Sequence, residues 1–145
     1  MEVYSIGFTR TTAEGFFGRL KDAGVRRLLD VRLNNSSQLA GWSKRADLPY
    51  FLRKLLGAEY VHEPLLAPTP GLRVAYQKTG DWANYERTFL ALMDERYVAE
   101  TVPQSLILDV PTVLLCSEAT ADQCHRRLVL EYLRDRWGNF SVTHL

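Results

Sequence analysis

A strand, a helix and a second strand follow one another within the first 33 residues, and this order constrains the fold more than any other feature. Residues 3–8 (VYSIGF) are β-branched and aromatic, as in a strand. Residues 11–24 begin with Thr11 and Glu14 at capping-box spacing and end at Gly24, as a helix does. Residues 26–33 (RRLLDVRL) form a second apolar run. This order is typical of a right-handed βαβ unit in a parallel sheet.

The same alternation continues to the end of the chain. We expect helices over residues 47–57, 81–100 and 120–137, the last with Thr120 and Gln123 as a capping box, and strands over 58–64, 112–116 and 140–145. Residues 64–80 contain three prolines and two glycines and are expected to be irregular, and residues 101–111 hold at most a short helix around 104–108. The sequence therefore predicts a single α/β domain over residues 1–145, with a mainly parallel five-stranded sheet and helices on both faces.

The charge balance and the N-terminus exclude several classes of protein. The 18 basic and 17 acidic side chains nearly cancel, so binding to nucleic acid would need a local patch. The first ten residues lack the pattern of a signal peptide, and no apolar run approaches the roughly twenty residues that span a bilayer. We expect a cytoplasmic protein with no membrane partner, in which the two cysteines are thiols rather than a structural disulfide.

Reactive side chains gather after an apolar run, in residues 114–127 (LLCSEATADQCHRR). Cys116 ends a predicted central strand, and Cys124, His125 and Arg126 open the next helix. Arg32 ends another predicted strand, and the carboxyl ends of parallel strands share one edge, where ligands of such sheets bind. Helix N-termini and arginines both favour anions, so the sequence predicts an anion site at this edge.

We assign the candidate residues two roles. The proposed catalytic groups, which would move protons or act as a thiolate, are Asp30, Glu118, His125 and Cys116. The proposed ligand-binding residues are Gly7, Arg32, Trp42, Lys44, Arg45, Cys124, Arg126 and His144. Each has a structural alternative: Asp30 and Glu118 can pair with the arginines, and His125 can bond a neighbouring carbonyl.

The two cysteines allow three interpretations. Cys116, Cys124 and His125, with His144, could bind a metal, but their spacing is unlike that of known zinc sites, and we assign no metal ligand. Cys116 could be a nucleophile, although the stretch to Arg126 lacks the glycines of a phosphate-binding loop. Both could also be small buried hydrophobic residues.

The loop over residues 34–45 contributes an aromatic residue beside two cations. A base could stack on Trp42 while Lys44 and Arg45 contact phosphate. The alternative is a loop whose tryptophan packs under the loop's own polar shell, which is the commoner case. Residues 64–80 could fold over the edge of the sheet as a lid, or form a rigid surface loop.

Several separated motifs resemble one known family. The stretch CSEATADQCHRRLV resembles the C-x-E…CHR signature of the domain of unknown function 488 family. DVRLNNSSQLAGWSKRADLPYFL, EYVHEPLLAPT and the terminal VTHL resemble one branch of that family, so the resemblance covers essentially the whole chain. It singles out Gly7, Asp30, Arg32, Cys116, Glu118, Cys124, His125, Arg126 and His144. One departure is Phe8, where many members have histidine.

The functional prediction is an anion-binding site at the carboxyl edge of the sheet, for a nucleotide or nucleic-acid phosphate, in a small hydrolase- or transferase-like enzyme. Two alternatives stay open. One is a non-catalytic module that binds nucleic acid or protein, and the other is a thiol redox or metal sensor. The sequence leaves the reaction, the cofactor and the oligomeric state open.

Overall fold

The five predicted strands form one parallel sheet. The computed structural model describes residues 1–36, 41–118 and 121–145, and in this part of the chain the strand order is β3-β2-β4-β1-β5, with every neighbouring pair parallel. The strands are β1 (Glu2–Gly7), β2 (Arg27–Asp30), β3 (Glu59–His62), β4 (Thr112–Cys116) and β5 (Ser141–His144). All residues of β4 are buried, as expected for a central strand.

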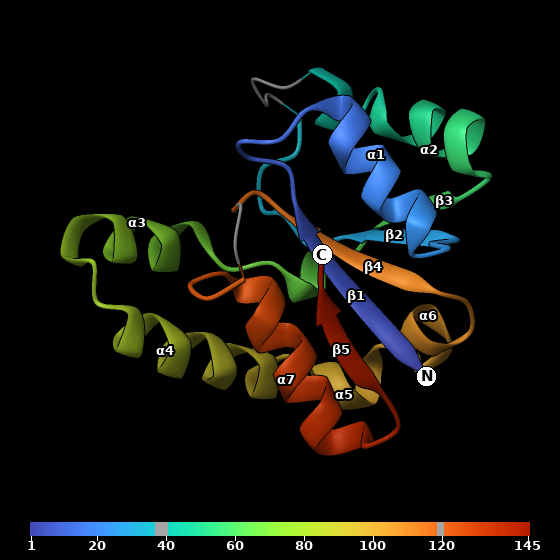
Figure 1. Cartoon of the computed structure of the whole chain (residues 1–145). Helices are drawn as coiled ribbons and strands as arrows, with labels where there is room; N and C mark the ends of the chain where they lie inside the picture. The colour runs from blue at the N-terminus through green and yellow to red at the C-terminus, as the bar shows by residue number, and fades with distance from the viewer. Residues whose placement is uncertain (37–40, 119–120) are drawn as a thin grey trace.

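Helices cover both faces of the sheet, and the predicted fold class is confirmed (Figure 1). One face carries α1 (Ala13–Asp22) and α2 (Leu48–Leu56), which pack on Ile6, Leu28 and Leu115. The opposite face presents Val3, Leu29 and Leu114. The helices on this side are α3 (Pro70–Thr79), α4 (Trp82–Glu95), α5 (Val98–Thr101), α6 (Ser105–Leu108) and α7 (His125–Trp137). Two short 3-10 helices, η1 (Gly41–Ser43) and η2 (Pro64–Leu66), complete the described elements. None of the described helices has the length and apolar character needed to cross a bilayer.

The prediction of an irregular segment over residues 64–80 is wrong. Most of this segment forms η2 and α3. The Thr69 hydroxyl accepts a hydrogen bond from the Leu72 amide at 3.1 Å, Pro70 stands at the first helical position, and Gly80 ends α3 with a φ of 66°. Proline and glycine therefore mark the two ends of a helix here, rather than preventing one.

Three helix boundaries also differ from the prediction. Thr12, not Thr11, caps α1 and accepts from the Gly15 amide at 3.0 Å. The helix expected over residues 81–100 is divided into α4 and α5, because Tyr97 adopts a left-handed conformation with a φ of 52°. The last helix begins at His125 with Cys124 as its N-cap, and the expected cap Thr120 lies outside the described residues.

Candidate functional site

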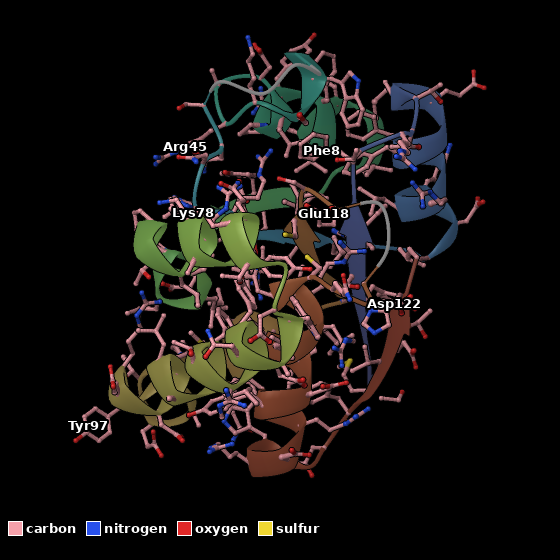
Figure 2. The ribbon with its side chains drawn as sticks, turned by 90° about the vertical axis from the view of Figure 1, so that its left-hand side faces the viewer. Phe8, Arg45, Lys78, Tyr97, Glu118 and Asp122 are labelled. Carbon is pink, nitrogen blue, oxygen red and sulfur yellow. The ribbon has the colours of Figure 1, made fainter. Side chains whose placement is uncertain are left out.

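A cavity opens where the chain leaves β2 and β4. These neighbouring strands connect in opposite directions, β2 through α2 to β3 at one edge and β4 through α7 to β5 at the other. Parallel sheets bind ligands at such a point. The cavity has a volume of about 160 Å³ and is lined by Arg32, Leu33, Asn34, Pro68, Arg73, Tyr76, Gln77, Tyr85, Cys116, Ser117, Glu118, Gln123, Cys124 and His125. In Figure 2, Glu118 lies at the end of the β4 ribbon, beside α3.

Cys116 and His125 form a hydrogen-bonded pair at the floor of this cavity. Cys116 Sγ lies 3.4 Å from His125 Nδ1, and His125 Nε2 donates to the Val31 carbonyl oxygen at 2.6 Å. The bond to Val31 leaves Nδ1 to exchange a proton with the sulfur. Phe89 packs against the imidazole, with ring centroids 5.6 Å apart. A thiol, a base and a group that orients the base are the elements of a nucleophilic site.

The two thiols of the site differ in acidity. The hydrogen bond from the Cys124 thiol lowers the pKa of Cys116, burial opposes this, and Arg126 and the backbone amides of Glu118 and Ser117 also lower it, so the pKa lies below its ordinary value. Burial, followed by the neighbouring Cys116 sulfur, raises the pKa of Cys124 well above the ordinary value. Cys116 is therefore the thiol that ionises first, and the thiolate is the nucleophilic form.

Asp30 and Arg32 form a buried ion pair beside the cavity. Arg32 Nε and Nη2 donate to the two carboxylate oxygens of Asp30 at 2.9 Å each, and the Arg32 amide donates to Oδ1 at 3.1 Å. Asn35 and the Tyr60 hydroxyl also donate to Asp30. Burial alone would raise the pKa of Asp30, but these hydrogen bonds and the Arg32 charge hold it below its ordinary value. The carboxylate is thus saturated with donors and does not line the cavity. Its geometry is that of a residue that positions Arg32.

The remaining nitrogen of Arg32 has no hydrogen-bond partner among the described residues, and the guanidinium carbon lies 5.4 Å from the centroid of the Phe8 ring. Within the described residues, Nη1 is the buried side-chain polar atom without a hydrogen bond, although Arg32 is only 2% exposed. Because Nε and Nη2 face Asp30, Nη1 points away from that carboxylate, on a side chain that lines the cavity. A buried guanidinium donor without a partner is costly, and an anionic ligand in the cavity would satisfy it.

Arg126 is used inside the protein. Its Nε donates to Ser5 Oγ at 3.1 Å, and Nη1 donates to the Glu118 carbonyl oxygen at 2.7 Å. The Ser5 hydroxyl is in turn hydrogen-bonded to His144 Nδ1. Burial, followed by the Arg126 charge, lowers the pKa of His144. Neither Arg126 nor His144 lines the cavity, so both connect β1 and β5 to the segment that follows β4.

Gly7 has a steric role at the same junction. A Cβ atom built on Gly7 would lie 1.6 Å from the Glu118 carbonyl oxygen. Because this oxygen belongs to the backbone, rotation of a side chain would not relieve the clash. The Thr9 amide also donates to the Ser117 carbonyl oxygen at 3.1 Å. The backbone at the end of β1 therefore packs closely against the backbone that follows β4, and this contact holds Ser117 and Glu118 at the cavity wall.

The other predicted ligand-binding residues lie away from the cavity lining. Trp42 is partly buried, and its ring packs against Phe8, Phe16 and Phe17 with centroid distances of 6.3, 4.8 and 5.7 Å. Neither Lys44 nor Arg45 lines the cavity. Glu118 does line it, and its side chain is exposed at the rim. Among the predicted site residues, the structure thus brings together Arg32, Cys116, Glu118, Cys124 and His125.

The cavity lining also contains residues that were not anticipated as site residues, among them four polar ones from three further segments. Arg73 and Tyr76 come from α3, Tyr85 comes from α4, and Gln123 precedes α7; the Tyr76 hydroxyl donates to Gln123 Oε1 at 2.9 Å. Burial, with the nearby cysteines, raises the pKa of Tyr85, which therefore keeps its proton. The signal for Tyr85 was present in the sequence, since a tyrosine on a buried helical stripe needs a polar neighbour for its hydroxyl. Arg73 had no such signal, because its segment was expected to be irregular.

The cysteines and the histidine also offer a metal donor set. Cys116 Sγ, Cys124 Sγ and one ring nitrogen of His125 lie within 4.8 Å of one another, and two sulfurs with one imidazole suit a soft cation such as zinc. Arg126 Nη1 lies 3.5 Å from Cys124 Sγ, and this positive charge opposes a cation at the same place.

Comparison with known proteins supports the resemblance seen in the motifs. Neither the curated proteins nor the solved structures that were searched include a match to this chain. A family model described as a domain of unknown function, DUF488, matches residues 12–133. This range contains the Asp30–Arg32 pair, both cysteines, His125 and Arg126, and it spans most of the 145 residues. The chain therefore belongs to the DUF488 family.

Proposed function

We propose that this protein binds a small anion in the cavity between β2 and β4 and acts on it as a hydrolase- or transferase-like enzyme with Cys116 as the nucleophile. The observation that carries this proposal is Arg32 Nη1, a buried cationic donor without a partner on a side chain that lines the same cavity as Cys116. Burial makes such a donor a strong anion ligand, because little water competes for it.

The surroundings of Arg32 add further attraction for an anion. Arg73 of α3 is a second guanidinium in the cavity lining. The 13-residue helix α7 begins at the cavity with His125, so its N-terminal amides and dipole contribute positive potential. Asp30 neutralises part of the Arg32 charge and fixes the orientation of the guanidinium, which leaves Nη1 aligned before a ligand arrives.

The Cys116–His125 pair supplies the chemistry. His125 Nδ1 takes the thiol proton from Cys116, and the Val31 carbonyl oxygen stabilises the imidazolium through Nε2. The thiolate then attacks an electrophilic atom of the bound anion. Glu118, exposed at the rim, is placed to exchange a proton with the leaving group or with solvent.

The size and lining of the cavity bear on the identity of the anion. A volume of about 160 Å³ suits a small anion or one phosphate-sized group. For a nucleotide or nucleic acid, only the phosphate would be bound by Arg32, since the indole of Trp42 is engaged with three phenylalanines of the protein. We therefore propose a small anion in place of stacking on a base.

The proposal is tested by the charge selectivity of cysteine alkylation in the Cys124→Ser background. We expect iodoacetate, an anion, to alkylate Cys116 faster relative to neutral iodoacetamide than it alkylates a free thiol in solution. Arg73→Gln and Arg32→Gln should each lower this ratio several-fold, and inorganic phosphate or sulfate should protect Cys116. Arg53→Gln, which removes an exposed arginine of α2, is the matched control and should leave the ratio unchanged.

Arg73→Gln keeps the test independent of folding, because Arg73 is only partly buried and is no part of the Asp30 ion pair. The anion site would be refuted if the ratio of the two alkylation rates were the same in the Cys124→Ser protein and in its Arg73→Gln and Arg32→Gln variants.

A further inference from the structure

The nucleophilic pair leaves the second thiol of the cavity unexplained. Cys124 is the N-cap of α7, yet its side chain makes no capping hydrogen bond. Its sulfur is buried and lies within 4.8 Å of both Cys116 Sγ and the ring nitrogen of His125. The sulfur instead accepts a hydrogen bond from Arg126 Nη1 at 3.5 Å. Cys124 is therefore next to the bond that would form when Cys116 attacks a ligand.

The position of Cys124 favours it over water as the second nucleophile. Any adduct on Cys116 must be released by a further attack, and Cys116 is only 5% exposed. A thiol held beside the adduct has the advantage of an intramolecular reaction over a water molecule that must enter. His125 is within reach to take the Cys124 proton, and Arg126 Nη1, 3.5 Å from Cys124 Sγ, stabilises the thiolate that results.

We propose that Cys124 is the resolving thiol of this site, an inference that rests on the proposed function. The substrate is then a thiosulfate-type anion, in which a sulfane sulfur is bonded to a sulfonate group. Release by Cys124 oxidises both cysteines, so the transferred atom must leave with the electron pair and be reduced. Phosphorus in phosphate cannot accept these electrons, whereas a sulfane sulfur does so readily and is a preferred target of thiolates. The sulfonate oxygens match the donors of Arg32 and Arg73.

The reaction proceeds in two balanced steps. The Cys116 thiolate attacks the sulfane sulfur, and the bond between the two substrate sulfurs breaks. Sulfite leaves with the electron pair and takes the proton that His125 received from Cys116, which produces a persulfide on Cys116 and returns His125 to its neutral form. His125 then takes the Cys124 proton, and the Cys124 thiolate attacks Cys116 Sγ. The Cys116–Cys124 disulfide forms, the persulfide bond breaks, and the outer sulfur leaves with its electron pair and the proton from His125, as hydrosulfide. A small external thiol reduces the disulfide and restores the site.

The test is a single turnover of the reduced full-length protein with thiosulfate, after removal of the reductant. We expect equal amounts of sulfite and sulfide, loss of both thiols, and a Cys116–Cys124 disulfide in the peptide masses. Cys124→Ser should still release sulfite, retain a persulfide on Cys116 and release no sulfide. Cys116→Ser should release neither product. Alkylation of Cys116 that favours iodoacetate over iodoacetamide in Cys124→Ser shows that this variant keeps the folded site.

The outcomes separate this inference from the function on which it rests. Equal sulfide release by the parent protein and Cys124→Ser would exclude a resolving role for Cys124. Absence of sulfite from the parent protein, with anion-selective alkylation intact, would refute the thiosulfate assignment and leave the anion site standing. A stoichiometric zinc ion that protects both thiols in the purified protein would overturn the redox step.

Discussion

Arg32 donates to both carboxylate oxygens of Asp30 at 2.9 Å, and the two side chains are almost completely buried. The pair lies where β2 ends, beside the cavity that contains Cys116 and His125. Asp30 thus fixes the buried guanidinium that the proposed anion would contact. The pair also makes the stability of the fold depend on the site, because a buried charge that loses its partner is strongly unfavourable.

Asp30→Asn should therefore destabilise the protein by about 3–5 kcal/mol, since it leaves the Arg32 charge buried and uncompensated. Urea unfolding measures the loss. Tyr60→Phe removes one donor to Asp30 and keeps the ion pair, so it should cost less, roughly 2 kcal/mol. Equal losses in the two variants would show that the ion pair is not the main contribution.

Acid should destabilise the protein through the same carboxylate. The pKa of Asp30 in the folded state lies below its ordinary value of 3.8. Its contribution to stability is complete above the pKa of the unfolded chain and is lost as the pH falls through the lower, folded pKa. We expect the free energy of unfolding to fall below about pH 4, and to fall less steeply in Asp30→Asn. Urea titrations over this range would contradict the assignment if the two slopes matched.

Cys124→Ala should raise the pKa of Cys116. The hydrogen bond from the Cys124 thiol is the largest contribution that lowers this pKa, so its removal leaves burial less opposed. The rate of alkylation by iodoacetamide, followed against pH, reports the inflection of Cys116 directly. Cys124→Ser keeps a hydroxyl donor at the same position and should restore part of the lower value. An inflection at the same pH in all three proteins would count against the thiol pair.

Gly7→Ala should destabilise the protein, because its new Cβ atom would lie 1.6 Å from the Glu118 carbonyl oxygen and one backbone segment must move. We expect a loss of about 1–3 kcal/mol, or more, and slower alkylation of Cys116 as the cavity wall shifts. Gly18→Ala is the matched control. No atom outside its own helix lies near that position in α1, so alanine should stabilise the protein by about 0.5–1 kcal/mol. A neutral Gly7→Ala would refute the close approach of the two backbones.

Thr12→Ala should cost about 1 kcal/mol of stability, because Thr12 caps the N-terminus of α1 through the Gly15 amide. Thr11→Ala should cost less, because the Thr11 hydroxyl accepts a hydrogen bond from Arg19 Nη2 at 3.2 Å but caps no backbone amide of α1. Thermal unfolding of the two variants decides between the neighbouring threonines. A larger effect at Thr11 would return the cap to the position that the capping-box spacing predicts.

The sequence by itself determined the order of the five strands along the chain and the edge at which the site lies. Short apolar runs alternate with capped amphipathic segments, and this local pattern requires a parallel sheet whose strands end at one edge. Arg32 and Cys116 follow two of those strands, and His125 opens the last helix, so their convergence was predictable. These features depend on residues that are close together in the sequence, so the pattern of apolar and polar residues is sufficient to predict them.

The tertiary structure decided which of these side chains meet. Asp30 shares a face of the sheet with Leu28, whereas Cys116 shares the opposite face with Leu114. The Asp30 carboxylate therefore binds Arg32 outside the cavity lining, and the Cys116 thiol lines the cavity. Likewise Arg126 is paired with Ser5, 121 positions away in the chain, and Trp42 packs against aromatic residues of another segment. Such contacts depend on strand order and on packing between distant segments. Local sequence propensity predicts neither the strand order nor this packing, because the partners of a side chain from distant segments are set only when the sheet assembles and the helices pack on it.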